Sequence, residues 1–391
     1  MTSTILPHIK VLDLSRVLAG PWCTQALADM GAEVFKIERQ GVGDEMRHSP
    51  PFLRGADGQP TKDSTSYVCV NRGKRSLTID FTQPAGQALL HELVRQCDVV
   101  VENFKAGDLQ RYRLDYESLR AIKPSLVYCS ITGYGQDGPM AALPGYDPVF
   151  QAISGLMSTC GLPEGEPGAG PMRSMLPLVD VMTGMVATST VLAALLHRER
   201  TGEGQHLDIC LLDTQVAMMA NMATNYLATG KPPARWGNAH PNIVPYQVFP
   251  TADGHMVLAI GNDGQFARFC IAAGHADKSV EPLFATNPAR VANRATLVPL
   301  LTSWTLTRTT AEWVDLLEHA AVPCSPILDV GQVLAHPHVA ARGMCVPGNG
   351  ADAPPTVANP MLFDGQRPVA DVPPPTLDNN RGQPAWRAPT R

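Results

Sequence analysis

The chain has 391 residues, of which 44% are hydrophobic and 17% are charged, and its 31 basic and 36 acidic residues give a net charge of −5. This length exceeds the size at which single hydrophobic cores usually stop growing, so we expect two domains. The acidic balance argues against broad nucleic-acid binding, which needs a basic surface. No run of about 18 apolar residues and no signal peptide is visible, so we expect neither a membrane span nor secretion.

The nine cysteines are scattered along the chain and include no C-x-x-C pair. An odd number without paired spacing argues against a disulfide framework and against a zinc site, so we expect no bound metal. We expect most of these cysteines to be small buried apolar residues in a reducing compartment. This favours a cytoplasmic location.

Short apolar segments alternate with helical patterns through the first third of the chain. We expect strands at 9–15, 32–38, 76–81, 98–104 and 125–135 and helices at 21–31 and 84–97. This alternation predicts an α/β fold with a parallel, doubly wound sheet. Such sheets bind ligands beyond the carboxyl ends of their strands. The polar residues expected at those ends are Arg16, Arg39, Asn103 and Lys105.

The loop after the first strand lacks the usual nucleotide-binding signatures. It reads SRVLAGPW, where dinucleotide-binding enzymes have G-x-G-x-x-G, and the chain has no G-x-x-x-x-G-K-[ST] loop. The predicted sheet therefore resembles a Rossmann fold, but binding of NAD or ATP is poorly supported.

The middle of the chain predicts a domain boundary. The segment 175–200 indicates a short strand or loop and then a long buried helix, and the helical pattern that follows ends at Gly230. A hairpin pattern at 246–261, with Asp253 and Gly254 in its turn, opens a region of different character. We expect a large domain made of 1–230 plus 326–391 and a small α+β domain at 231–325.

Asp180 follows mainly apolar residues and precedes the long helix. Its position predicts a helix N-cap, because an aspartate there accepts hydrogen bonds from free backbone N–H groups. The alternative is a catalytic carboxylate. The two hypotheses are compatible, because the positive end of a helix stabilises an ionised carboxylate and its N–H groups can bind an oxyanion.

A basic segment, NRGKRS at 71–76, precedes the third strand. It is either a solvated loop or a cradle for phosphates, in which Arg16, Arg39, Lys105 and Arg111 could take part. His240, in GNAHPNIVPYQ, is either a structural or a functional histidine. The sequence contains neither H-E-x-x-H nor G-x-S-x-G, which argues against zinc proteases and common serine hydrolases.

Several segments in order resemble one enzyme family. They are VLDLSRVLAGPWCTQALADMGAEVFKIE, GVGDEMR, NRGKRSLTIDF, VVENFKAG, ITGYGQDGP, GYDPVFQAISG, VDVMTGMVATSTVLAALLHRERTGEGQHLDICLLD and VPCSPILDV. The chain resembles the class III CoA transferases, which include formyl-CoA transferase and carnitine CoA transferase. The resemblance runs from about Ile9 to Met344 and depends on the order of the motifs rather than on any one of them.

The resemblance implies an interlocked homodimer with a large Rossmann-like domain built from both ends of the chain and a small middle domain. Asp180 matches the catalytic aspartate of the family, and Tyr146 matches an active-site position. Arg16 adjoins the positions that match the lining of the CoA site, which are Val17, Leu18, Ala19, Arg39, Ile79, Asn103, Phe104, Lys105 and Arg111.

The implied reaction is covalent CoA transfer through an aspartyl mixed anhydride and an aspartyl-CoA thioester, without a permanently bound cofactor. Coenzyme A and acyl-CoA are substrates, together with small carboxylic acids. Leu18 and Ser49 replace the pocket glutamine and tryptophan of formyl-CoA transferases, and 259–266 lacks their glycine run. Oxalate is therefore doubtful.

The segment from Asn225 to Gly254 is instead similar to succinyl-CoA-dependent members that use dicarboxylates. We expect succinyl-CoA as the donor and a dicarboxylic acid as the acceptor. The candidates for holding the distal carboxylate of the acceptor are Arg47, Arg235 and His240.

Two other functions are weighed against transfer. The first is an α-methylacyl-CoA racemase, which needs an acid/base pair across the α-carbon and has G-H-D where this chain has Gly145, Tyr146 and Asp147. A tyrosine in place of the histidine removes half of that pair. The second is a CoA-binding scaffold without catalysis.

Overall fold

A computed structural model describes residues 5–54, 58–348, 354–380 and 385–387. Backbone contacts group the chain into two compact units. The first unit comprises Met1–Leu156, Arg173–Gly230 and His336–Arg391, and the second comprises Met157–Met172 and Lys231–Ala335. The second unit thus includes residues on both sides of the range 231–325 expected for the small domain. The division into a large domain of 1–230 plus 326–391 and a small domain at 231–325 stays a prediction.

The first unit is built on a six-stranded sheet. Its strands are β1 (Lys10–Asp13), β2 (Glu33–Glu38), β5 (Lys74–Thr78), β6 (Val99–Glu102), β7 (Val127–Thr132) and β8 (Gln205–Cys210). They lie in the order β5-β2-β1-β6-β7-β8, and every neighbouring pair is parallel. In order of appearance this is 3-2-1-4-5-6, the order of a Rossmann-type doubly wound sheet. The predicted α/β class with a parallel sheet is confirmed.

Helices and short strands surround this sheet. The helices of the first unit are α1 (Ala19–Asp29), η1 (Glu45–His48), α2 (Thr65–Val68), α3 (Pro84–Gln96), η2 (Gln110–Tyr112), α4 (Tyr116–Ile122), α5 (Asp147–Ile153), α7 (Leu178–Thr201), α8 (Leu211–Met218), α9 (Ala220–Thr229) and α15 (Pro337–Ala341). Two antiparallel pairs of short strands complete it, which are β3 (Phe52–Arg54) with β4 (Pro60–Ser64) and β12 (Cys345–Val346) with β13 (Thr356–Val357).

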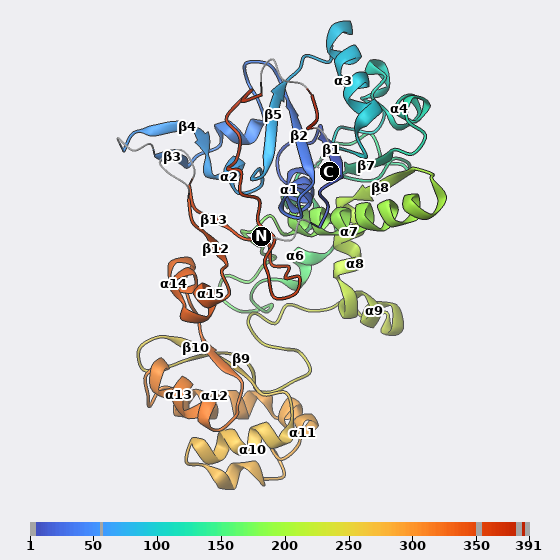
Figure 1. Ribbon diagram of the computed structural model, residues 1–391. Coiled ribbons are helices and arrows are strands. Elements are labelled where there is room, and N and C mark those ends of the chain that lie inside the picture. The colour runs from blue at the N-terminus through green and yellow to red at the C-terminus, as the bar shows by residue number, and fades with distance from the viewer. Residues whose placement is uncertain (1–4, 55–57, 349–353, 381–384, 388–391) are drawn as a thin grey trace. The chain divides into compact units, whose positions relative to one another are not determined.

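Alternating side chains of the strands build two separate cores. In β6, Val99 and Val101 pack in a cluster with residues of α1 and α7, whereas Val100 packs with residues of α3 and α4. Successive side chains of a strand point to opposite faces, so a run of valines serves a sheet that is covered on both sides. Figure 1 shows α3 and α4 on one side of β7 and α7 on the other.

The long helix α7 contributes to the core of the first unit. Among the described residues it is the one helix long and apolar enough to cross a membrane by length and composition, although 44% of that window is buried inside the protein. Val179, Ala187 and Val191 are fully buried in the cluster shared with α1 and the sheet. The helix ends at Thr201, and the following Gly202 has the left-handed backbone (φ 77°) typical of a helix C-terminus. The buried face is that of a core helix.

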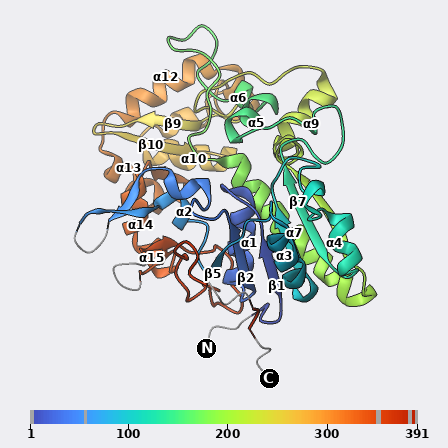
Figure 2. The ribbon, with the colours of Figure 1, turned by 90° about the horizontal axis from the view of Figure 1, so that it is seen from above.

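The C-terminal segment returns to the first unit and covers the outer edge of the sheet. The N–H of Ser76 donates to Asn379 Oδ1 (2.8 Å), and the N–H of Thr78 donates to Asp378 Oδ1 (3.0 Å). Trp386 packs against Phe35 with ring centroids 4.5 Å apart and the ring planes tilted by 56°. Figure 2 shows the segment beside β5. These side-chain acceptors satisfy donors that an edge strand would otherwise leave open.

The second unit contains a three-stranded antiparallel sheet in the order β11-β10-β9. Its strands are β9 (Tyr246–Pro250), β10 (His255–Ala259) and β11 (Cys324–Pro326), so the predicted hairpin is present. Its helices are α6 (Leu156–Thr159), α10 (Asp263–Ala272), η3 (Ala276–Ser279), α11 (Asn287–Ala292), α12 (Arg294–Thr305), α13 (Thr310–His319) and α14 (Val330–Ala335). A separate core with Phe266, Phe269 and Trp313 holds this unit together.

Candidate active site

The switch point of the sheet lies between β1 and β6, where the chain turns in opposite directions as it leaves neighbouring strands. In open α/β sheets this crevice is the usual ligand site. Here the segments leaving the two strands are joined by one side chain. The N–H of Arg16 donates to Asn103 Oδ1 (2.8 Å), and Asn103 Nδ2 donates to the carbonyl of Arg16 (2.6 Å). The mouth of the crevice is therefore fixed on both sides.

A pocket of about 250 Å³ opens at this point. Nine of the residues expected at the site line it together, which are Arg16, Val17, Leu18, Ala19, Asn103, Phe104, Lys105, Tyr146 and Asp180. They come from the ends of β1 and β6 and from the starts of α1, α5 and α7. The fold thus brings together residues up to 164 positions apart.

Asp180 is not the N-cap of α7, so that prediction is wrong. The helix begins at Leu178, and Asp180 is its third residue. The capping oxygen belongs to Asp147 in α5, whose Oδ2 accepts the N–H groups of Val179 (2.8 Å) and Asp180 (3.2 Å). Asp147 Oδ1 in turn accepts from Gln151 Nε2 (2.5 Å). Because a residue from another helix satisfies these donors, the Asp180 carboxylate is left for the pocket.

The ionised form of Asp180 is disfavoured in this position. Burial and, after it, the negative charge of Asp147 raise the pKa of Asp180 from 3.8 to about 7. We had expected the helix N-terminus to keep this carboxylate charged. The helix N–H groups nearest to Asp180 donate to the negatively charged Asp147 instead. The repulsion between the two carboxylates therefore opposes the favourable effect of the helix dipole. A partly buried carboxyl with a pKa near neutrality is a common feature of active sites.

Arg16 provides positive charge at the mouth of the pocket. Its guanidinium lies over the ring of Phe104, 4.9 Å from the centroid, and Nη1 pairs with Glu45 Oε1 at 2.6 Å. Arg16 and Glu45 are both about half exposed. Lys105 also lines the pocket. The acids Glu45 and Asp108 line the pocket as well. The pair of Arg16 with Glu45 is exposed and therefore weak, so both cations can still turn to a polyanionic ligand.

The basic segment 71–76 is neither a solvated loop nor a phosphate cradle. Lys74 is fully buried, and its Nζ donates to Asp13 Oδ2 (3.0 Å) and Asn71 Oδ1 (2.8 Å). Arg72 forms a buried pair with Asp29 (2.8 Å). Both cations are therefore paired with acidic side chains inside the protein, Arg72 with Asp29 and Lys74 with Asp13. They neutralise buried carboxylates, and so they are not available to a ligand.

Other predicted site residues are distributed differently. Arg39 and Ile79 follow β2 and β5 at the same edge of the sheet, where Arg39 is exposed and Ile79 is buried. Arg111 is exposed in η2, 3.8 Å from Asp108. These three do not line the pocket around Asp180. Whether they contact CoA stays a prediction.

Arg47 cannot serve as a free ligand for a carboxylate. It is 3% exposed, and all three guanidinium nitrogens have partners. Nε and Nη2 donate to the two oxygens of Glu38 (2.8 Å each), and Nη1 donates to Asp63 (2.6 Å). The expectation that Arg47 binds substrate is corrected, because the buried pair with Glu38 occupies it.

Arg235 and His240 lie in the second unit. Arg235 pairs with Glu164 and also donates to the carbonyl of Leu162 (3.2 Å). His240 Nδ1 accepts the N–H of Asn242 (3.1 Å). Their roles toward a substrate stay predictions.

Sequence reasoning missed Asp147 as a functional residue, since we discussed it only as part of the Gly145-Tyr146-Asp147 motif. Its place directly before Pro148, at the start of a helical pattern, was a signal for an acid at a helix start. No local pattern indicates that its carboxylate would cap a different helix, 33 residues further along. Among the described residues, no group of three histidine, cysteine or acidic side chains could hold a metal ion.

Comparison with known proteins identifies the class of protein to which this fold and pocket belong. The family model for CoA-transferase family III matches residues 6–381. The chain therefore belongs to CoA-transferase family III and is a CoA transferase.

Among its relatives, a succinate–glutarate CoA-transferase of Agrobacterium fabrum is 46% identical over 97% of this chain and 94% of its own length. A succinyl-CoA:mesaconate CoA-transferase of Haloarcula hispanica is 37% identical over 97% of this chain and 95% of its own. The crystal structure of a CAIB/BAIF family protein from Brucella suis is 42% identical, covers 95% of both chains and superposes with a TM-score of 0.84.

Proposed function

We propose that the enzyme transfers CoA from succinyl-CoA to a dicarboxylic acid such as glutarate, with Asp180 as the nucleophile. The observation that carries this proposal is the place of Asp180 in the pocket at the switch point, beside the start of α1 and the turn after β6. The names of relatives at 37–46% identity support the succinyl donor and a dicarboxylate acceptor. The enzyme class supports acyl-CoA as a substrate rather than a permanently bound cofactor.

The first half of the reaction moves the acyl group onto Asp180. A carboxylate oxygen attacks the thioester carbonyl carbon, the C–S bond breaks, and CoA leaves as the thiolate, which gives a mixed anhydride. The thiolate then attacks the Asp180 carbonyl carbon and releases succinate, which leaves an aspartyl-CoA thioester. A partly buried carboxylate with a raised pKa is more basic than a solvated one, which favours attack once it is ionised.

The second half repeats these steps in reverse with the acceptor. The acceptor carboxylate attacks the aspartyl thioester and releases the CoA thiolate, and a second mixed anhydride forms. The thiolate attacks the acceptor carbonyl carbon and Asp180 leaves as the free carboxylate. No proton or electron is gained or lost in the sum, so the steps require no oxidant and no ATP. Water must be kept out, because it would hydrolyse either anhydride.

The racemase alternative is less well supported. Proton exchange at the α-carbon needs an acid/base pair, and the described lining of the pocket around Asp180 contains no histidine. Tyr146 occupies the motif position at which that chemistry would need a histidine, and it is 64% exposed. The geometry therefore favours a single nucleophile over a proton-transfer pair.

The homodimer belongs to this proposal. Met175, Leu176 and Leu227 are each more than two-thirds exposed in the single chain, and apolar surface of this kind usually marks an interface. A second copy of the chain would cover it, and the family resemblance implies that the two copies are interlocked. A cytoplasmic location is kept as a prediction.

The experiment that tests the proposed function is a matrix of acyl-CoA donors against acceptor acids, read by mass spectrometry as new CoA esters. We expect transfer from succinyl-CoA to C4–C6 dicarboxylates and none in Asp180→Ala. Hydroxylamine added during turnover should label the peptide that contains Asp180. Unchanged transfer in the variant, or a label on another carboxylate, would contradict the assignment. Arg235→Ala and His240→Ala, tested with mono- and dicarboxylates, would show which residue holds the distal acid group.

A further inference from the structure

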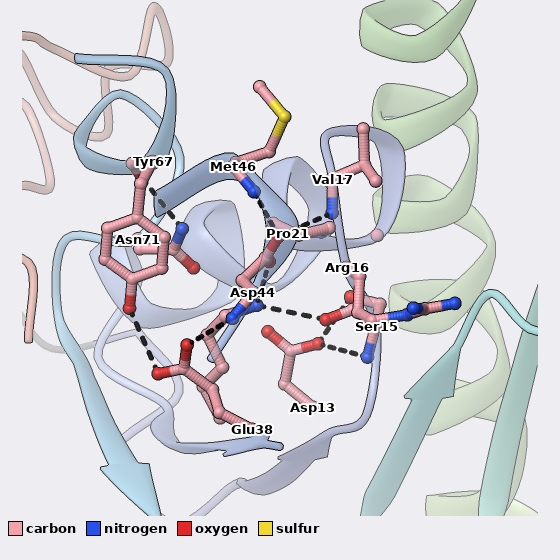
Figure 3. A network of polar contacts seen from close by, with 12 residues as sticks. Asp13, Ser15, Arg16, Val17, Pro21, Glu38, Asp44, Met46, Tyr67 and Asn71 are labelled. Atoms are coloured by element: carbon pink, nitrogen blue, oxygen red, sulfur yellow. Dashed lines mark hydrogen bonds and ion pairs between the residues drawn. The ribbon is translucent and has the colours of Figure 1, made fainter. Parts of the chain in front are cut away.

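The segment Ser15–Val17, which leads from β1 into the pocket, is held by side chains instead of by backbone partners. The N–H of Ser15 donates to Asp13 Oδ1 (3.0 Å), and its carbonyl accepts from Lys36 Nζ (3.0 Å). The side chain of Asn103 binds both the N–H and the carbonyl of Arg16. The N–H of Val17 donates to a side chain as well, that of Asp44. Five consecutive backbone groups, from the N–H of Ser15 to the N–H of Val17, thus have side-chain partners, some of which Figure 3 shows.

Val17 has a backbone conformation that this residue type rarely adopts. Its φ is +68°, in the left-handed region, where the branched side chain of valine is strained. Such strain costs about 1–3 kcal/mol and persists only where the surroundings impose it. Val17 lines the pocket and directly precedes Leu18, the N-cap of α1. The strained residue therefore sets where the first turn of α1 lies.

The partner of Val17 is the buried carboxylate of Asp44. The N–H of Val17 donates to Asp44 Oδ1 (3.2 Å), which also accepts the N–H of Met46 (3.0 Å). Asp44 is 1% exposed, and its other oxygen, Oδ2, lies 2.9 Å from the ammonium group of the fully buried Lys36. Asp44 does not line the pocket. Asp44 thus lies outside the pocket and binds Val17, the strained residue that lines it.

The start of α1 has free donors, as the first turn of a helix does when no side chain caps it. In the described chain no acceptor binds the N–H of Leu18, Ala19 or Gly20, and Pro21 has no N–H. Leu18 and Ala19 line the pocket together with Asp180. N–H groups at a helix start bind anionic oxygens, and CoA and its thioesters carry several. The position of these donors depends on the φ of Val17.

We infer that Asp44 is a positioning residue for the CoA site: it holds Val17 in the left-handed conformation that presents the start of α1 to the ligand. This inference rests on the proposed function, because it takes the pocket as the CoA site. It assigns to Asp44 no contact with substrate. Loss of the Asp44 oxygen should therefore weaken CoA binding, and removal of the strain at Val17 should restore it.

The test compares two variants that differ only in the acceptor at position 44. Lys36→Met is introduced in both, so that neither leaves a buried ammonium group without its partner. The hydrogen bond from Lys36 to the Ser15 carbonyl is then absent from both variants alike, so it does not contribute to their difference. Asp44→Asn keeps an oxygen for the Val17 N–H, and Asp44→Leu has a similar volume without it. We expect CoA, measured by calorimetry, to bind about tenfold more weakly to K36M/D44L than to K36M/D44N, since about 1.4 kcal/mol of strain is no longer compensated.

The same pair is then measured with Val17→Gly added, because glycine adopts a positive φ without strain. The tenfold ratio should fall to less than about threefold, a non-additivity expected only if Asp44 acts through Val17. A merely structural loss would leave the ratio unchanged. If K36M/D44L does not fold, Asp44→Ser replaces Asp44→Leu, since serine still caps the turn at Met46 but is one bond shorter.

Three outcomes are distinguished. Equal CoA affinity in the Asn and Leu variants, or a ratio that persists when Val17→Gly is added, overturns the role of Asp44. A tenfold ratio of CoA affinities between the Asn and Leu variants that falls below about threefold when Val17→Gly is added supports that role. Failure of the unmodified enzyme to bind CoA or to transfer it between acids counts against the proposed function instead.

Discussion

The carboxylate of Asp147 caps the helix that carries Asp180, with Oδ2 2.8 Å from the N–H of Val179 and 3.2 Å from the N–H of Asp180. One acid thus fixes the position of the other and also repels its charge. Burial of the carboxyl and, after it, this repulsion explain how a carboxyl at the start of a helix has a raised pKa although the helix dipole would lower it.

Asp147→Asn should shift the acid limb of the pH–rate profile to lower pH. The amide oxygen can still accept the helix N–H groups. Burial still raises the pKa of Asp180, but the second cause, the negative charge of Asp147, is gone. Because the ionised form attacks, kcat/KM should persist about 0.5–1 pH unit further into acid. The profile is measured from pH 5 to 9 with succinyl-CoA. Asp137→Asn, which neutralises an exposed acid, serves as the control, and a shift toward higher pH would contradict the prediction.

Asp180→Asn should stabilise the folded protein more at pH 8 than at pH 5.5. In the folded state the pKa of Asp180 is about 7, whereas the unfolded value is near 3.8. The folded state therefore holds more protons between these values, and stability falls as pH rises through that window. Replacing the carboxyl removes this pH dependence. The gain in the free energy of unfolding should therefore be about 1–3 kcal/mol larger at pH 8 than at pH 5.5. Urea unfolding at both pH values measures it, and an equal effect at both would refute the burial of an ionisable group.

Arg47→Lys should lower stability without changing the acceptor KM. The buried, bidentate pair with Glu38 matches the planar guanidinium and not an ammonium group. We expect the free energy of unfolding to fall by about 2–4 kcal/mol. Arg95→Lys, at an exposed pair with Glu92, should change it by less than about 0.5 kcal/mol. An intact fold with a raised KM for the dicarboxylate would instead return Arg47 to the substrate site.

Gly184→Ala should destabilise the contact between α7 and α1. A Cβ at this position would lie 2.7 Å from the carbonyl oxygen of Ala19 and 2.9 Å from Trp22 Cβ. Both neighbours are backbone or near-backbone atoms that cannot move independently, so the helices must separate, at about 1–3 kcal/mol. Thermal unfolding measures the loss. Glu199→Ala, at an exposed position on α7, should have almost no effect.

A further consequence of Gly184→Ala concerns catalysis. Ala19 lines the pocket, and Asp180 lies one turn before Gly184 on α7. Moving α1 away from α7 therefore increases the separation between the two sides of the site. We expect kcat to fall more than tenfold at a temperature where the variant is still folded, because catalysis is sensitive to misplacement of about 1 Å. Unchanged kcat would mean that the spacing of α1 and α7 is not critical.

The sequence by itself determined the sheet and its edge. Apolar runs such as Val99–Val101 predict strands that are buried on both faces. The structure confirms this, because the three valines are divided between two cores on opposite faces of the sheet. The carboxyl ends of parallel strands meet at one edge, so the sequence predicts Arg16, Arg39, Asn103 and Lys105 at that edge. All but Arg39 line the pocket. These predictions follow from the chain's own periodicity, which depends on residues close in sequence.

Only the tertiary structure decided which charged side chains are paired inside the protein and which remain available to a ligand. Lys74 and Arg47 look like ligands for anions in sequence, but Asp13 and Glu38, which come from other strands, neutralise them. Asp180 looks like a helix cap, but Asp147 takes that role from a different helix. A charged side chain is neutralised by whichever opposite charge the fold brings within about 4 Å, and sequence separation does not limit that choice.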